Sequence, residues 1–354
     1  MYHTAIRAST RKPRHSSPSV LRPGRFRPIL RAMKRISQKN FLKALEGTRR
    51  GFQRKYLAMY SSFTGGIVTD PVLMLIPVDD HIVHRGDGIF ETFKCIDGSI
   101  YNMNAHLKRL AGSAGKLQLV PPRPFGGIGR LVVDTVRAAG RRDSLIRVLI
   151  SRGSGGFGVS PYECPQAQLF IIVSEHVPSF MTAHPAGAGA VSSSIPVKPP
   201  FFAGIKACNY LPNVLMKKEA ADAGVDFAVG FDERGCLAEG ATENFGIVTR
   251  DGRLLFPPLE HILAGTTMLR AAELARTLVK NGTLKSVAFA AIPGRMLRSA
   301  AEILAIGTTP DVTAVVRLDD RPVGGGRPGP VQQQLNAMLA RDMRENRALL
   351  TPVF

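Results

Sequence analysis

Lys206 stands at a position where an amine could do chemistry. It follows a short apolar stretch and precedes the turn-like run Asn-Tyr-Leu-Pro-Asn, which leads into a predicted helix at 211–224. A lysine taken out of water has a lowered pKa, and its neutral amine is a nucleophile that condenses with carbonyl groups. A solvated surface charge is the alternative, because lysine is common and Lys217 and Lys218 lie nearby. Lys206 is therefore a candidate nucleophile whose weight depends on the residues that accompany it.

An isolated acid, two Gly-Thr-Thr sequences and an arginine could accompany this amine. Glu239 lies inside the otherwise apolar segment GCLAEGATENFGIV, and burying a carboxylate without a partner costs several kcal/mol. Gly-Thr-Thr follows an apolar run at 265–267 and again at 307–309, where backbone N–H groups and hydroxyls can form an anion site. Arg109 could bind a phosphate through two parallel hydrogen bonds. Each also has a local alternative: Glu239 pairs with a neighbour, the threonines cap helices, and Arg109 lies on the surface.

The elements that must position these residues include both strands and helices. In the first half, Asp97-Gly98 marks a hairpin turn between two β-rich runs. The other predicted elements of this half are strands at 73–78, 145–151 and 167–175 and helices at 105–119 and 127–140. In the second half they are strands at 226–232, 236–250, 253–257 and 302–309 and helices at 211–224, 266–282 and 331–344. This order predicts an α/β (α+β) protein.

The positive charge of the chain is concentrated near its N-terminus. Residues 1–56 contain 11 Arg and 5 Lys against one acid, Glu46, so they hold most of the net charge of +20. Residues 1–33 predict a basic disordered leader. Its Arg, Ser and Pro content fits an organelle transit peptide, a disordered tail, or residues upstream of a later start codon at Met33 or Met59. Residues 34–59 predict an amphipathic basic helix, since apolar residues recur at three- to five-residue steps between Lys and Arg.

Nucleic acid and membranes are partners that this charge distribution does not favour for the rest of the chain. Residues 57–354 hold only the remainder of the net charge, and no apolar run approaches the roughly 18–20 residues of a membrane helix. Binding of nucleic acid or of an anionic membrane surface through residues 1–56 stays open as an alternative function. We expect an intracellular, cytoplasmic protein, or a plastid or mitochondrial one if residues 1–33 are a transit peptide.

The four cysteines predict no metal site. Cys95, Cys164, Cys208 and Cys236 form no C-x-x-C pair, and no histidine cluster accompanies them. We therefore expect four reduced thiols, as in an intracellular protein, and no zinc.

Six segments occur in an order that is typical of one enzyme family. They are DDHIVHRGDGIFETF, AHLKRLAGSA, IKACNYLPNVL, AEGATENFGIV, ILAGTTMLR and EILAIGTTPDVT. From about residue 60 to its C-terminus, the chain resembles the class IV aminotransferases, the fold-type IV pyridoxal-phosphate enzymes. GGIVTDP, SSIPVKPP and VQQQLNAMLARDM look most like the chloroplast D-amino-acid transaminase group, whereas GFGVSP and AEGATEN look more like branched-chain aminotransferases.

The resemblance implies a role for each candidate residue. Lys206 matches the lysine that forms the Schiff base with pyridoxal 5'-phosphate and moves a proton between the substrate α-carbon and the cofactor C4′. Glu239 matches the acid that keeps the pyridine nitrogen protonated, which makes the ring an electron sink. Asn244 matches a residue that supports the turn of this acid. The remaining cofactor-binding matches are Arg109, Thr266, Thr267 and Thr308 at the phosphate and Tyr210 near the phenolic oxygen.

The substrate side departs from the family pattern. Arg147 matches an arginine that branched-chain enzymes place near the substrate, and Thr309 lies at the carboxylate-binding strand end. Leu145 stands where those enzymes usually have tyrosine, Pro310 where alanine or serine is usual, and Ala314 where proline is common. The resemblance therefore predicts Arg147 and Thr309 as substrate-binding residues but does not specify an L or a D substrate.

The resemblance implies a homodimeric enzyme with two domains per chain. We expect a small N-terminal α/β domain at 60–176, a linker at 177–186 and a larger pseudo-barrel domain at 187–354, with pyridoxal 5'-phosphate between the domains. The implied reaction moves an amino group between an amino acid, either a branched-chain L- or a D-amino acid, and a 2-oxo acid. A 4-amino-4-deoxychorismate lyase, which eliminates pyruvate with the same cofactor set, is the alternative.

Overall fold

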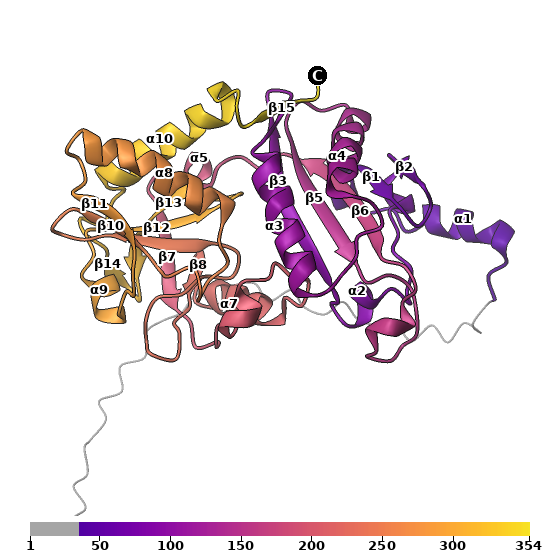
Figure 1. Cartoon of the computed structure of the whole chain (residues 1–354), viewed down its shortest axis with the longest axis horizontal. Coiled ribbons are helices and arrows are strands. Elements are labelled where there is room, and N and C mark those ends of the chain that lie inside the picture. The colour runs from indigo at the N-terminus through magenta and orange to yellow at the C-terminus, as the bar shows by residue number, and fades with distance from the viewer. Residues whose placement is uncertain (1–34) are drawn as a thin grey trace, which may run out of the picture. The chain divides into compact units, whose positions relative to one another are not determined.

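The computed structural model of the protein describes residues 35–354 (Figure 1). Its contacts divide the chain into two compact units, residues 1–47 and Thr48–Phe354. The leader predicted at 1–33 lies outside the described residues. Helix α1 (Gln38–Glu46) is the described element of the first unit, and none of its side chains is buried.

The helix predicted at 34–59 is wrong in its extent. Helix α1 ends at Glu46, and a 3₁₀ helix, η1 (Gly51–Lys55), and the strand β1 (Tyr56–Ser61) follow. Glycines at both ends of the connection disfavour a continuous helix, because glycine loses more conformational freedom in a helix than other residues do. The apolar residues of β1 instead pair with another strand of a sheet, a tertiary contact that helical spacing does not reveal.

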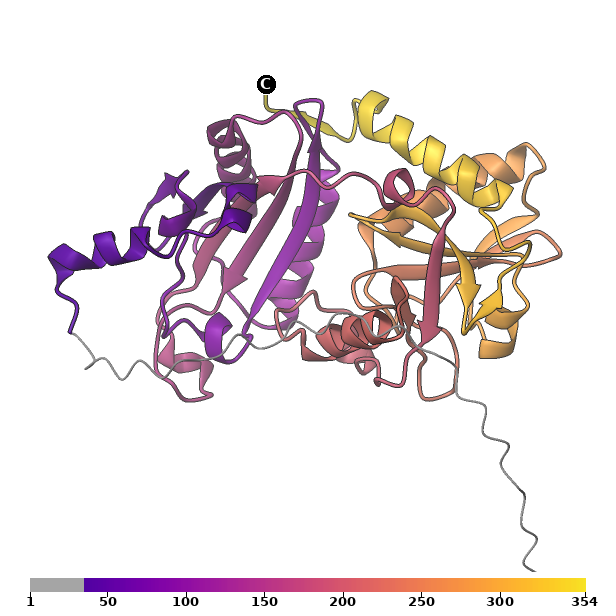
Figure 2. The same ribbon diagram turned by 180° about the vertical axis from the view of Figure 1, so that it is seen from behind.

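The first sheet has seven strands in the order β15-β4-β3-β5-β6-β1-β2, with every neighbouring pair antiparallel (Figures 1 and 2). Besides β1, its strands are β2 (Gly66–Val68), β3 (Gly88–Ile96), β4 (Ser99–Tyr101), β5 (Ser144–Ser151), β6 (Gln168–Glu175) and β15 (Leu350–Pro352). Asp97 and Gly98 join β3 to β4 with φ angles of 51° and 83°, so the predicted hairpin turn is confirmed.

Helices α3 (Met103–Lys116) and α4 (Phe125–Ala139) pack against the first sheet and bury its core. Leu110 of α3 and Val132 of α4 are fully buried, as is Val148 of β5. Alternate residues of β5 point to the opposite face, where Arg147 is exposed. The two faces of this sheet are therefore unlike: one is a packed core and the other remains open.

The second sheet has eight strands, with β11-β10-β9-β12-β13-β7-β8 in order and β14 paired to β13. Parallel and antiparallel pairs are mixed, since β7 runs parallel to both β13 and β8. Its strands are β7 (Ala188–Ser192), β8 (Phe227–Val229), β9 (Asn244–Val248), β10 (Arg253–Phe256), β11 (Ser286–Phe289), β12 (Glu302–Gly307), β13 (Asp311–Leu318) and β14 (Arg321–Pro322).

Helices α8 (Thr266–Lys280) and α10 (Pro330–Glu345) lie together over the second sheet (Figure 2). Arg270 of α8 donates two hydrogen bonds to Asp342 of α10, at 2.9 and 2.6 Å, and this pair ties the helices together. Helix α7 (Leu211–Asp222) lies between β7 and β8 in the chain. Shorter helices complete the chain: η2 (Pro71–Leu73), α2 (His81–His84), η3 (Pro161–Glu163), α5 (Phe180–Ala183), α6 (Pro200–Ala203) and α9 (Gly294–Arg298).

The division predicted at 177–186 falls between β6, the last internal strand of the first sheet, and β7, which begins the second. The chain crosses back once, because β15 near the C-terminus pairs with β4 of the first sheet. Contacts group residues 48–354 into one compact unit, so the two-domain division remains a prediction.

A buried ion pair joins the two sheets. Lys94 of β3 and Asp311 of β13 approach to 2.7 Å between Nζ and Oδ1, and only 4% and 7% of these residues' surfaces are exposed. Asp311 adopts a φ of 52°, a conformation that aspartate tolerates better than most residues. The pair fixes β3, which carries several residues of the site described next, against the second sheet.

Candidate active site

Lys206 lies between α6 and α7, and its backbone is held by the first sheet and by α3. Its N–H donates to the Ser113 hydroxyl at 3.2 Å, and its carbonyl accepts the Phe90 N–H at 2.9 Å. The amine Nζ lies 4.6 Å from the centre of the Phe90 ring. Burial, reinforced by the charge of Arg109, lowers the pKa of Lys206 to about 8. This is the setting in which a lysine is nucleophilic near neutral pH.

Glu239 lies in the turn before β9. Its Oε2 accepts the Leu263 N–H at 2.9 Å, and Asn244 donates from Nδ2 to the Leu263 carbonyl at 2.9 Å. The two side chains therefore bracket one residue of the loop before α8. Burial raises the pKa of Glu239, opposed by the Leu263 hydrogen bond and the nearby charges of Lys198 and Lys206.

One cavity brings the amine and the acid together. Lys206, Glu239, Tyr210 and Asn244 line it, together with a second lysine, Lys198. The Tyr210 ring stands edge-on to the Phe90 ring, with 5.1 Å between the centres, and the Lys198 Nζ lies 4.9 Å from the Tyr210 ring centre. Burial raises the pKa of Tyr210 and lowers that of Lys198. Sequence reasoning missed Lys198, whose only signal is its place in the SSIPVKPP segment.

Arg109 of α3 is held by a buried acid that the sequence analysis did not single out. Glu91 of β3 is fully buried and accepts from Nε and from Nη2 of Arg109, each at 2.7 Å. The Nη1 group of Arg109 donates to the Ala264 carbonyl at 3.1 Å. Burial alone would raise the pKa of Glu91, yet hydrogen bonds and charge from Arg109 and His106 bring it down to about 2. The available signal was an acid within the β-rich run at 88–96.

The predicted phosphate threonines lie at two chain turns. Thr266 and Thr267 open α8 and are buried, whereas Thr308 and Thr309 follow β12 and are partly exposed. The Thr266 hydroxyl lies 3.2 Å from Nε2 of His106, and the Thr308 hydroxyl donates to the Thr92 carbonyl at 3.2 Å. No side chain of the described residues caps the N-terminus of α8, whose first backbone N–H groups lack helical partners.

Arg147 lies at the open face of the first sheet. It is exposed, its guanidinium carbon lies 5.6 Å from the Phe90 ring centre, and within residues 35–354 it forms no ion pair. A groove of about 430 Å³ extends from it over the sheet. Apolar side chains form most of this groove, including Tyr56, Met59, Leu145, Leu149 and Ile172.

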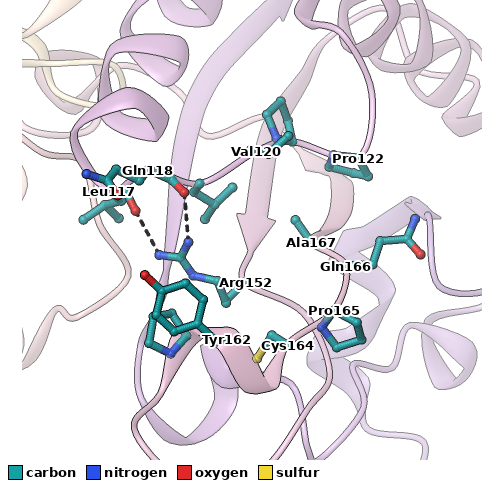
Figure 3. A pocket seen from close by; sticks show the side chains of 13 residues that line it. Leu117, Gln118, Val120, Pro122, Arg152, Tyr162, Cys164, Pro165, Gln166 and Ala167 are labelled. Carbon is teal, nitrogen blue, oxygen red and sulfur yellow. Dashed lines mark hydrogen bonds between the residues drawn. The ribbon is translucent and has the colours of Figure 1, made fainter.

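A separate pocket contains none of the predicted site residues (Figure 3). There Arg152 donates to the carbonyls of Leu117 and Gln118 at 3.1 and 3.3 Å, and to both carboxylate oxygens of Asp87. Its guanidinium is thus satisfied inside the protein.

Over residues 35–354, no helix has the length and apolar content needed to cross a membrane. In the same part of the chain, no three His, Cys, Asp or Glu side chains gather as metal ligands.

Comparisons with known proteins identify the family of this chain. The sequence model of the family described as Amino-transferase class IV matches residues 88–318, a span that contains Arg109, Lys206 and Glu239. The chain is 38% identical over 292 residues to "D-amino-acid transaminase, chloroplastic" of Arabidopsis thaliana, covering 82% of this chain and 78% of that one. It is 30% identical over 263 residues to the putative branched-chain-amino-acid aminotransferase of Methanocaldococcus jannaschii, covering 73% and 88%.

A solved structure shares the fold. The branched-chain aminotransferase of the thermophilic archaeon Thermoproteus uzoniensis, crystallised with norvaline, superposes with a TM-score of 0.75 at 26% identity, covering 84% of this chain and 100% of that one. The predicted fold class is thereby confirmed. Because these relatives are transaminases by name, they favour transamination over the lyase reaction. The chain belongs to the class IV aminotransferase family and is a transaminase.

Proposed function

We propose that this transaminase holds pyridoxal 5'-phosphate at Lys206 and moves an amino group between an amino acid and a 2-oxo acid. The observation that carries the proposal is the single cavity lined by the Lys206 amine and the Glu239 carboxylate. The lowered pKa of Lys206, to about 8, supports it, because a neutral amine is the form that reacts with an aldehyde.

Side chains that line the cavity, and Arg109, whose charge acts on Lys206 and Glu239, fit the cofactor's three chemical features. Lys206 offers an amine for the aldehyde, and Glu239 offers a carboxylate for a protonated ring nitrogen. For the phosphate, three of the five N–H groups of Arg109 are used within the protein, so two remain. The partnerless backbone N–H groups at the start of α8 add further donors for an anion.

The protein's part in the reaction would be to hold and move protons. When bound, the cofactor supplies an aldehyde and a ring that accepts electrons from the substrate carbon. Glu239 would keep the proton on the ring nitrogen by accepting a hydrogen bond from that N–H group. Lys206 Nζ would take the proton from the substrate α-carbon and deliver it to the cofactor C4′. Phe90 and Tyr210 would keep water from the amine.

For substrates we propose amino acids with apolar side chains. Arg147 would bind the α-carboxylate, because it is exposed, without an ion pair among the described residues, and beside the Phe90 ring that also contacts Lys206. Thr309 would assist from the end of β12. The apolar groove next to Arg147 would take the side chain of a branched-chain L-amino acid or of a D-amino acid. The names of the relatives support both classes.

We further propose a homodimer and a plastid location. Several apolar side chains are exposed, among them Phe52, which lines the groove, at 61%, Leu75 at 50% and Val78 at 72%, and a second copy of the chain would cover them. A chloroplastic relative and the Arg-, Ser- and Pro-rich composition of residues 1–33 support a transit peptide. Light scattering and import into isolated plastids, respectively, test these two proposals.

The visible spectrum of the purified protein tests the proposed function. We expect a band from bound cofactor that is absent from Lys206→Ala and that one added amino acid, D-alanine or L-leucine, converts to the pyridoxamine form. The amino acid that converts it identifies the stereochemical preference. A wild-type protein that takes up no pyridoxal 5'-phosphate would contradict the proposal.

A further inference from the structure

Glu91 and His106 lie beside the proposed phosphate site, although no step of the proposed reaction uses them. Glu91 holds Arg109 by one edge of its guanidinium through two hydrogen bonds of 2.7 Å. The same carboxylate contacts Nδ1 of His106 at 2.7 Å, and Nε2 of His106 lies 3.2 Å from the Thr266 hydroxyl. A continuous chain of hydrogen bonds therefore runs from β3 to the first residue of α8.

The position of each proton in this chain follows from the donors and acceptors. Glu91, with a pKa of about 2, is ionised and can only accept, so Nδ1 of His106 carries a proton. Burial lowers the pKa of His106, and the positive charges of Arg109 and Lys206 lower it further, whereas Glu91 raises it. A neutral imidazole with its proton on Nδ1 offers a lone pair at Nε2. The Thr266 hydroxyl must therefore donate to His106.

The other two predicted phosphate threonines, Thr308 and Thr267, differ from each other in whether the hydroxyl proton is used within the protein. Thr308 points its hydroxyl at the carbonyl of Thr92, and because a carbonyl can only accept, this hydroxyl proton is also used within the protein. Thr267 is buried, at 8% exposure, and in the described part of the chain its hydroxyl has no hydrogen-bond partner. Of the three hydroxyl protons, only that of Thr267 remains undirected.

We propose that Glu91, acting through His106, turns the Thr266 hydroxyl proton away from the cofactor phosphate, so that Thr267 supplies the hydroxyl hydrogen bond to that phosphate. This inference rests on the proposed function and deepens it. Thr266 then contributes its backbone N–H, in company with the N–H groups of Thr267 and Arg109. Glu91 and His106 are positioning residues: they set the direction of a hydrogen bond that they do not themselves offer to the cofactor.

Isosteric removal of each hydroxyl tests whether Thr267, rather than Thr266, donates the hydroxyl hydrogen bond to the phosphate. The dissociation constant of pyridoxal 5'-phosphate is measured by absorbance on the full-length protein, freed of cofactor, for wild type, Thr266→Val and Thr267→Val. A hydrogen bond to a charged group predicts at least about tenfold weaker binding for Thr267→Val, and about twofold or less for Thr266→Val. Equal losses, or a larger loss from Thr266→Val, would overturn the inference.

Two further results keep the test decisive. In ¹⁵N spectra of histidine-labelled protein, with His106 assigned by its loss in His106→Gln, we expect the proton on Nδ1 in wild type and a weaker preference in Glu91→Gln. A proton on Nε2 in wild type, or no change in Glu91→Gln, would overturn the role of Glu91 even if a valine variant failed to fold. Failure of the wild-type protein to bind the cofactor would contradict the proposed function; normal binding with the opposite threonine ranking would contradict only this inference.

Discussion

Lys206 and Phe90 are joined through both backbone and side chain, although they belong to distant segments of the chain. The Phe90 N–H donates to the Lys206 carbonyl at 2.9 Å, and the Lys206 Nζ lies 4.6 Å from the Phe90 ring centre. Phe90 is part of β3, in the first sheet, whereas Lys206 precedes α7 and most strands of the second sheet. The position of the amine therefore depends on how the two sheets pack.

Replacing Lys206 with alanine is expected to remove the visible band of bound cofactor and to lower kcat by several orders of magnitude, because no other amine of the described residues has the same position. Absorbance and steady-state kinetics provide the measurement. Lys218→Ala is the matched control, since Lys218 is exposed and its helical ion pair with Asp222 contributes little. Retention of both band and activity in Lys206→Ala would transfer the role to another lysine, with Lys198 as the first choice.

The rate of cofactor uptake should rise with pH. The pKa of Lys206 is lowered from 10.5 to about 8, so the neutral amine, the form that attacks an aldehyde, increases about tenfold per pH unit below 8 and then levels off. Stopped-flow absorbance between pH 6 and about 9.5, on protein freed of cofactor, gives the profile. A profile that continues to rise up to about pH 9.5 would mean that the amine is solvated.

Glu239→Gln should raise the stability of the cofactor-free protein at about pH 8 and lower the transaminase activity. Burial raises the pKa of Glu239 above 4.5, so the folded state holds this proton more tightly than the unfolded chain does. Its contribution to stability is complete below pH 4.5 and is lost as pH rises through the raised pKa. We therefore expect cofactor-free Glu239→Gln to unfold at higher urea than wild type at about pH 8, with little difference near pH 4.5, while transaminase activity falls sharply. A variant less stable than wild type at the higher pH would contradict this sign.

Lys94→Met should destabilise the protein more than the combined change Lys94→Met/Asp311→Asn. The single change leaves a buried aspartate without its cation and should cost about 3–5 kcal/mol, whereas the double change removes both charges. Asparagine is chosen to replace Asp311 because position 311 has a positive φ, which asparagine tolerates. Urea denaturation of cofactor-free protein measures both. Equal losses would show that the ion pair is solvated when the sheets are packed.

Arg147→Leu should raise KM for the amino acid by about tenfold or more and leave the visible band unchanged, because a hydrogen-bonded charge on the substrate carboxylate is lost and the cofactor contacts remain. Arg130→Leu is the control, since Arg130 is an exposed residue of α4, outside the site. An unchanged KM would assign the carboxylate to another group, such as Thr309.

Several features of the fold could be read from local patterns. The Asp97-Gly98 turn lies where it was predicted because its positive φ angles depend on the two turn residues themselves. The predicted helix at 266–282 is α8, Thr266–Lys280, and that at 331–344 is α10, Pro330–Glu345, since an apolar face of helical period spans each. Local spacing failed at 34–59, where pairing of β1 with β6 prevailed over helical periodicity.

By itself, the sequence determined which groups could do chemistry: an amine, an isolated acid, an arginine and two Gly-Thr-Thr turns, in an order that identifies the family. Only the tertiary structure decided how those groups are held. Glu91 and His106 escaped notice because a single acid in a strand and a histidine in a helix reveal their partners only when β3, α3 and α8 come together. The direction of the Thr266 proton depends on three segments distant in sequence, because each hydrogen bond takes its donor and acceptor from different elements.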